Sequence, residues 1–328
     1  MDLIDEFKAG FHRQIRAKLI FNPGSGQPGE SPQQLLSILS EMQNQQILPE
    51  VYITNPESNL KEVVQTAIKS GIKLIVVAGG DGTIDSVAGA MIGSDATLGI
   101  IPTGTRNNVA FNLGITGDIV NCVSLLRQGR RLKIDVGRAH CGHTRQWFLE
   151  GVALGLISDL YPMADGIQHG DLVQIAGLLT TLISATPSNL RVNLNGKEHF
   201  DTTTHMMLIA NMAFIGPHFQ VSPDVSFKDS YLDVFTFSDM NKLNMISYAV
   251  LSPADLVEDA GHKHYRAKHI KIVSEPQMSV LADGVLLGQG PLSVHIYPRA
   301  LKVMAGKELT GPPAQKVTAE PQLELNEV

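Results

Sequence analysis

Cysteine is nearly absent from this chain of 328 residues, which contains only Cys122 and Cys141. Two cysteines cannot form the disulfide framework on which small secreted proteins depend, so a reducing cytoplasm is the expected compartment. The opening residues, Met1-Asp2-Leu3-Ile4-Asp5-Glu6, are acidic where a secretory signal needs a positive region followed by an apolar one. The sequence therefore predicts a cytoplasmic location.

Long hydrophobic runs are lacking as well. The longest apolar segment, Leu172 to Ala185, has about fourteen residues with polar interruptions, which is too short for a spanning helix and is typical of a core helix or an interfacial segment. Residues 1–16 place apolar side chains at helical spacing, which predicts a helix attached to the first domain, with a membrane-surface anchor as the alternative. Any membrane contact is therefore expected to be peripheral.

An excess of basic residues is also missing, since 26 Lys and Arg face 32 Asp and Glu for a net charge of −6. Broad nucleic-acid binding needs a basic face, so we expect no nucleic-acid partner. The one dense basic stretch, residues 262–271, is predicted to be a solvated strand face, with contact to anionic lipid headgroups as the alternative.

A glycine cluster directly after a buried strand is the strongest signal in the chain. The apolar run Leu74 to Ala78 is typical of a strand in a parallel sheet, and Gly79-Gly80-Asp81-Gly82-Thr83 follows it and leads into a helical pattern. Glycines let backbone N–H groups approach a ligand, and the positive end of a helix suits a phosphate. This segment predicts a nucleotide-phosphate site, in which Asp81 handles Mg²⁺ or a proton.

Alternating strand and helix patterns over residues 17–131 predict a doubly wound α/β nucleotide-binding domain. Four polar loops should lie together at the carboxyl ends of its strands, because ligands bind there in such sheets. These loops contain Asn22, Thr54, Asp81 and Thr105.

Closely spaced strand patterns over residues 132–305 predict an antiparallel β-sandwich-like second domain, and whether its last segment returns to the first domain stays open. His140-Cys141-Gly142-His143 lies between two strand patterns, which favours a hairpin turn over a metal site. Residues 306–328 are expected to form a disordered tail.

Four features in this order resemble the diacylglycerol kinase catalytic-domain family, which includes bacterial lipid kinases and sphingosine kinases. They are Asn22-Pro23-Gly24-Ser25-Gly26, Gly79 to Thr83, the loop Ile101 to Asn108, and the late pair Asp229-Ser230-Tyr231-Leu232-Asp233 with Asp283-Gly284-Val285. The resemblance implies an ATP- and Mg²⁺-dependent kinase that phosphorylates a diacylglycerol- or sphingoid-like lipid in a cleft between two domains.

The resemblance also implies roles for single residues. Those that match nucleotide-binding positions are Asn22, Pro23, Gly24, Ser25, Gly26, Thr54, Gly79, Gly80, Asp81, Gly82, Thr83 and Thr105. Those that match a divalent-ion site are Ser226, Asp229 and Tyr231. Asp81 and Asp283 are the candidate catalytic groups.

Four positions depart from the family pattern. Val285 stands where the family has the Glu that serves as general base, and a valine cannot accept a proton. Arg106 replaces a Gly, Asn108 an Asp, and Ser230 a Gly.

Two other functions therefore stay open, together with the identity of the lipid and a homodimer. One is a nucleotide- or lipid-binding module with impaired catalysis. The other is an NAD kinase-type enzyme, because NAD kinases share the glycine-Asp motif.

Overall fold

A computed structural model describes residues 14–26, 29, 31–160, 185–215, 219–238 and 263–307. Its first part alternates strands and helices: β1 (Ile15–Phe21), α2 (Ser31–Asn44), β2 (Ile47–Ile53), α3 (Leu60–Lys69), β3 (Leu74–Gly79), α4 (Asp81–Met91), β4 (Thr97–Pro102), α5 (Asn108–Asn112) and α6 (Ile119–Gln128). The expected N-terminal helix and C-terminal tail lie almost wholly outside the described residues, as does the apolar segment 172–184.

The second part is dominated by strands. They are β5 (Arg130–Cys141), β6 (Thr144–Phe148), β7 (Gly151–Gly155), β8 (Ser188–Leu194), β9 (Glu198–Thr204), β10 (Met206–Ala210), β11 (Phe214–Ile215), β12 (Phe219–Gln220), β13 (Leu232–Thr236), β14 (Lys263–Ala267), β15 (His269–Glu275), β16 (Ser279–Ala282), β17 (Val285–Gln289) and β18 (Leu292–Ala305). One short helix, α7 (Leu156–Leu160), follows β7.

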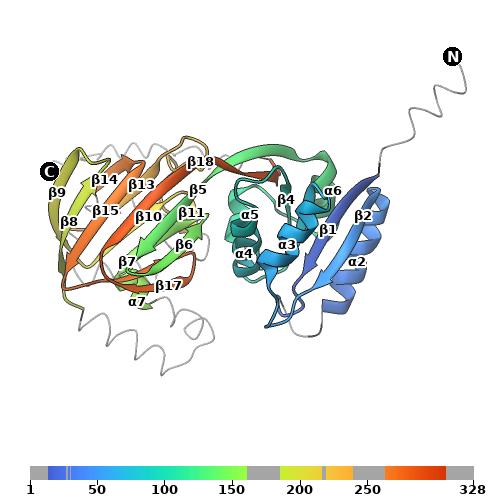
Figure 1. The fold of residues 1–328 in the computed structure, drawn as a ribbon, viewed down its shortest axis with the longest axis horizontal. Helices are drawn as coiled ribbons and strands as arrows, with labels where there is room; N and C mark the ends of the chain where they lie inside the picture. The colour runs from blue at the N-terminus through green and yellow to red at the C-terminus, as the bar shows by residue number, and fades with distance from the viewer. Residues whose placement is uncertain are drawn as a thin grey trace, which may run out of the picture.

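The four N-terminal strands form a parallel sheet in the order β2-β1-β3-β4. All six residues of β3 are buried, as expected for a central strand of a parallel sheet. Helix α2 packs against α6 and α3 against α4. Since α2 and α3 connect strands in opposite directions across the sheet, right-handed crossovers place these two pairs on opposite faces (Figure 1). The predicted doubly wound α/β domain is confirmed.

The second domain is a sandwich of two sheets (Figure 1). One runs β14-β13-β10-β7-β16-β17, and the other contains β5, β6, β8, β9, β15 and β18. Residues from both sheets, among them Val152, Ile209, Ile270 and Val294, form one buried apolar cluster. The predicted antiparallel sandwich is therefore also confirmed.

Strand β18 links the two domains. Its first half pairs antiparallel with β15 and β5 in the sandwich. Near its end, Lys302 and Val303 pair in parallel with Thr97 and Leu98 of β4. The sheet of the first domain therefore continues through β18 into the second domain.

Some local expectations differ from the structure. The predicted N-terminal helix, residues 1–16, is wrong at its end: Ile15 and Arg16 belong to β1, because they pair with Ile47 and Leu48. His140 to His143 form the predicted hairpin: β5 ends at Cys141, β6 begins at Thr144, and Gly142 has a φ of +56°. The basic stretch forms β14 and β15 over its described residues. No helix in the described part of the chain is long and apolar enough to cross a membrane.

Candidate active site

The loop after β1 is tied to the glycine cluster by Asn22. Its backbone N–H donates to the carbonyl of Ala78 (2.9 Å), and its Nδ2 donates to Oγ1 of Thr83 (2.9 Å). Its Oδ1 accepts the N–H of Gly24 (3.0 Å), which folds the loop back on itself. The first and third polar loops therefore lie side by side at the strand ends, as the sequence predicts.

The loop after β4 closes against the same place. The N–H of Thr103 donates to the carbonyl of Gly79 (3.2 Å), and the hydroxyls of Ser25 and Thr103 are 2.7 Å apart. A Cβ on Gly104 would lie 2.5 Å from Cα of Gly80, so glycine is required where these two backbones meet. This loop carries Thr105 along the same edge.

Thr54 and Pro23 are two further predicted nucleotide positions. Thr54 follows β2, and its N–H donates to the carbonyl of Phe21 at the end of β1 (2.9 Å). Pro23 is exposed in the turn of the first loop. The structure thus brings all four predicted loops to one edge of the sheet.

Helix α4 begins within this edge. Its N-cap residue, Gly80, has no side chain with which to cap the helix, so the first N–H groups are left to water or a ligand. The partial positive charge of the helix end favours an anion there. Asp81 is the first helical residue, and its Oδ1 accepts the N–H of Val109 in α5 (3.3 Å).

Asp283 approaches from the second domain, in the turn between β16 and β17. Its carboxylate accepts the backbone N–H groups of Leu149 (2.5 Å), Glu150 (3.2 Å) and Gly151 (2.9 Å). Burial raises the pKa of Asp283 to about 6, although these three backbone hydrogen bonds act in the opposite direction. The side chain of Asp283 thus holds the segment between β6 and β7 in place.

Two buried carboxyl groups that the sequence reasoning missed, Asp85 and Glu150, lie near Asp81 and Asp283. Burial raises the pKa of Glu150, as do the nearby charges of Asp283 and Asp81, while a hydrogen bond from Asn108 lowers it. Burial also raises the pKa of Asp85, together with Asp283, Glu150 and Asp81. The four carboxyl groups come from both domains and therefore mark the boundary between them.

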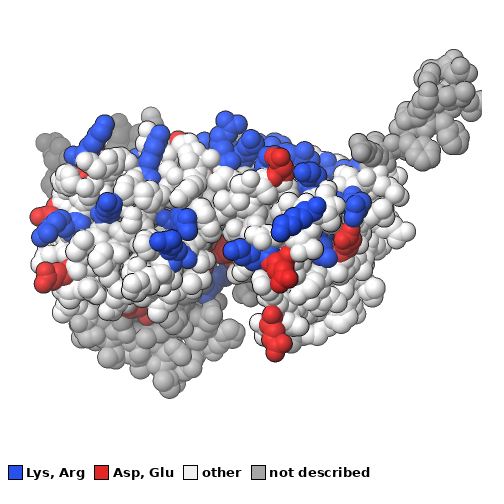
Figure 2. Space-filling model, in the orientation of Figure 1, with Lys and Arg blue, Asp and Glu red and all other residues white. Residues whose placement is uncertain are grey.

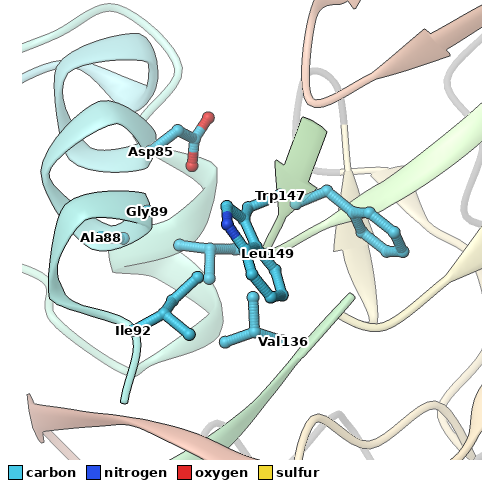
Figure 3. A pocket seen from close by; sticks show the side chains of 8 residues that line it. Asp85, Ala88, Gly89, Ile92, Val136, Trp147 and Leu149 are labelled. Atoms are coloured by element: carbon cyan, nitrogen blue, oxygen red, sulfur yellow. The ribbon is translucent and has the colours of Figure 1, made fainter. Parts of the chain in front are cut away.

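Asp85 lies on the face of α4 that packs against the second domain. Figure 3 shows it above the contact of Ala88, Gly89 and Ile92 with Trp147 and Leu149. Its Oδ1 is buried without a hydrogen-bond partner. One sequence signal could have found Glu150: it is the only charged residue in the apolar run Trp147 to Leu156.

The predicted divalent-ion residues lie before β13, and their contacts do not fit an ion. Oδ1 of Asp229 accepts the N–H of Tyr231 (3.0 Å), and Oδ2 is paired with the guanidinium of Arg266. Oγ of Ser226 accepts the N–H of Lys228 (3.3 Å). Both oxygens of the Asp229 carboxylate already bear a donor. Within the described residues, no group of three or more His, Cys, Asp or Glu side chains is arranged to hold a metal ion.

This combination defines a class of protein: two domains, in which the glycine-rich edge of a parallel sheet faces a β-sandwich across a cluster of buried carboxyl groups. Residues 16–139 match the diacylglycerol kinase catalytic domain. Residues 162–305 match the YegS C-terminal NAD kinase beta sandwich-like domain. Residues 16–139 therefore belong to the diacylglycerol kinase catalytic-domain family.

Relatives agree with this assignment. A diacylglycerol kinase of Bacillus subtilis (strain 168) is 26% identical over 301 residues, which cover 89% of this chain and 97% of the relative. An uncharacterized protein of Synechocystis sp. (strain ATCC 27184 / PCC 6803 / Kazusa) is 26% identical over 313 residues, or 88% of this chain and 70% of that one. A crystal structure of a diacylglycerol kinase from Bacillus anthracis str. Sterne shares the fold, with a TM-score of 0.68 and 21% identity over 89% of this chain and 97% of that one.

Proposed function

We propose that this kinase-family chain transfers the γ-phosphoryl group of ATP, bound with Mg²⁺, to a hydroxyl of a diacylglycerol- or sphingoid-like lipid. The observation that carries the proposal is the meeting of three loops at the uncapped start of α4, opposite carboxyl groups of the second domain. The loops after β1, β3 and β4 would bind the phosphates through backbone N–H groups, with Thr54 and Thr105 at the rim. The lipid would enter from the side of the second domain.

The reaction forms a bond between the lipid oxygen and the γ-phosphorus and breaks the bond between that phosphorus and the bridging oxygen of ADP. Mg²⁺ supplies charge neutralisation on the phosphates. The chain must position both reactants and accept the proton of the lipid hydroxyl. Positioning and charge neutralisation carry much of phosphoryl transfer, so a kinase without the family's usual base can still work slowly.

Asp81 is the best-placed group to organise this proton transfer. It stands at the start of α4, is only partly buried, and makes one long hydrogen bond to Val109 (3.3 Å). Asp283, the other candidate, is committed to three backbone N–H groups. We therefore assign Asp81 the proton and Mg²⁺ role, and Asp283 the role of positioning the segment around Glu150.

The test is ATP turnover with mixed micelles of diacylglycerol, monoacylglycerol or sphingosine, comparing the native protein with Asp81→Asn. We expect one lipid class to be phosphorylated, and the rate to fall by about 10²-fold or more in the variant. Equal rates would remove the role of Asp81. ATP binding without turnover on any lipid would favour the impaired binding module, and phosphorylation of NAD instead of lipid would favour an NAD kinase-type enzyme.

A further inference from the structure

A cluster of opposite charges joins β13, β14 and the loop before β13. Asp233 of β13 is the cross-strand partner of Arg266 of β14, and Phe235 is the partner of His264. Asp229 and Tyr231 precede β13 in the chain and approach Arg266 from the loop. Two of the three residues that the family resemblance assigns to a divalent ion, Asp229 and Tyr231, are therefore part of this cluster.

The guanidinium of Arg266 lies at the centre of the cluster. Its Nη2 donates to Oδ2 of Asp229, and its Nε lies 3.4 Å from Oδ1 of Asp233. The guanidinium carbon is also 4.8 Å from the centre of the Tyr231 ring, within the range of a cation–π contact. One cation thus contacts two carboxylates and an aromatic face.

Asp233 makes this cation necessary. Its side chain is fully buried, and an unpaired buried carboxylate is costly. Burial raises the pKa of Asp233, while His264, at 2.8 Å from Oδ1, and Arg266 both favour the ionised form. Among the described residues, removal of Arg266 would leave His264 as the one cationic partner of Asp233 and would leave Asp229 with none.

A divalent ion at Asp229 would meet cations already in place. Arg266 occupies one carboxylate oxygen, and Nζ of Lys268 lies 4.9 Å from the centre of the same Tyr231 ring. An added ion of charge +2 would be repelled by both. It would also have to displace a charge-assisted hydrogen bond, which is among the stronger bonds in proteins.

The loop held by Arg266 reaches the strands that join the two domains. Ser230, next to Asp229, has a φ of +67°, a conformation that favours glycine. Its N–H donates to Oδ2 of Asp135 in β5 (2.6 Å), and Oδ1 of Asp135 accepts the N–H of Arg299 in β18 (2.7 Å). Through these two hydrogen bonds, Asp135 connects the loop to β5 and β18.

We infer that the guanidinium of Arg266 takes the place of the divalent cation that the family resemblance assigns to Ser226, Asp229 and Tyr231. The chain thus carries its own cation at this position, and the stability of its second domain does not depend on a metal ion there. The inference concerns folding and ion binding and stands apart from the proposed kinase activity.

The first experiment measures thermal unfolding of the full chain in EDTA and in millimolar Mg²⁺, without nucleotide. We expect the Tm of the native protein to be the same in both. Arg266→Ala should lower Tm by several degrees in EDTA and should regain part of the loss in Mg²⁺. Lys268→Ala is the matched control: it removes a neighbouring cation on the same ring that is not paired with Asp229, and its Tm should not respond to Mg²⁺.

The second experiment does not depend on whether Arg266→Ala folds. Mn²⁺, used as a spectroscopic probe, is titrated into the native protein and into Asp229→Asn. We expect every Mn²⁺ site of the native protein to be present in Asp229→Asn as well. A native Tm that rises with Mg²⁺, a Mn²⁺ site lost in Asp229→Asn, or an Arg266→Ala protein that no divalent ion stabilises would each overturn it.

Discussion

Gly82→Ala separates the two roles assigned to the start of α4, because it should stabilise the helix and weaken ATP binding at once. Gly82 is the second residue of α4, is exposed, and has no atom within 4 Å of an added Cβ. Alanine in a helix is favoured over glycine by about 0.5–1 kcal/mol, which corresponds to a rise in Tm of about 1–3 °C. In the absence of ATP, Gly82→Ala should therefore stabilise the folded protein.

For ATP binding, the same substitution should be unfavourable. If the phosphates lie against the N–H groups of this turn, the added methyl group takes space that they need, and overpacking of this kind costs about 1–3 kcal/mol. The dissociation constant for ATP should then rise about 5- to 150-fold. Thermal unfolding without nucleotide and calorimetric titration with ATP and Mg²⁺ measure the two effects on the same preparation.

Gly89→Ala provides the matched control in the same helix. Its Cβ would lie 3.7 Å from Cδ1 of Trp147, an ordinary contact, and Gly89 follows Gly82 by about two turns of α4. We expect a similar gain in Tm with no change in ATP affinity. An unchanged ATP affinity in Gly82→Ala, with Tm raised, would refute the placement of the phosphates at this turn.

Two further substitutions probe the loop junction and the missing base. Gly104→Ala brings a Cβ to 2.5 Å from Cα of Gly80, so we expect a loss of about 1–3 kcal/mol in the free energy of unfolding, measured by urea titration; unchanged stability would mean that the two backbones can separate freely. Val285→Glu should raise lipid phosphorylation by up to about 10²-fold, because Val285 is 43% exposed and a carboxylate there stays solvated. Val285→Gln is its control, and an equal gain in both variants would show that polarity, not proton acceptance, is what the position lacks.

The first domain was predictable because its signals are local. The buried strand β3, the glycine cluster and α4 follow one another without a gap, so periodicity and glycine content identify all three. The position of Asn22 beside Thr83 follows from the rule that ligand loops gather at the carboxyl ends of parallel strands.

Several strands of the second domain were missed because their composition hides them. Strand β7 begins and ends with glycine, and β9 is rich in polar and charged residues that lie mostly on exposed positions. Propensity and alternation give weak signals in such segments, and pairing with neighbouring strands decides their structure.

The contacts of the candidate site that involve distant residues could not be read from the sequence either. Asp85 and Glu150 are 65 positions apart, and they approach only because α4 packs against β6, which Glu150 follows closely. Arg266 reaches Asp229 only through the register between β13 and β14. The family pattern assigns Asp229 to a divalent ion, but it gives no sign that the guanidinium of Arg266, on another strand, contacts the same carboxylate.

The continuity of β18 sets a limit on how the molecule can be divided. Within the described chain, residues 14–128 contain every helix and strand of the first domain. The strand that pairs with the open side of β4 is β18, which lies near the end of the described residues. A fragment that stops at α6 would expose the open edge of a hydrophobic parallel sheet, the kind of edge at which chains aggregate. The two halves are therefore joined by the paired strands β5 and β18, and bending between the halves has to pass through the irregular pairing at Tyr297 to Leu301, where these two strands run from one half into the other.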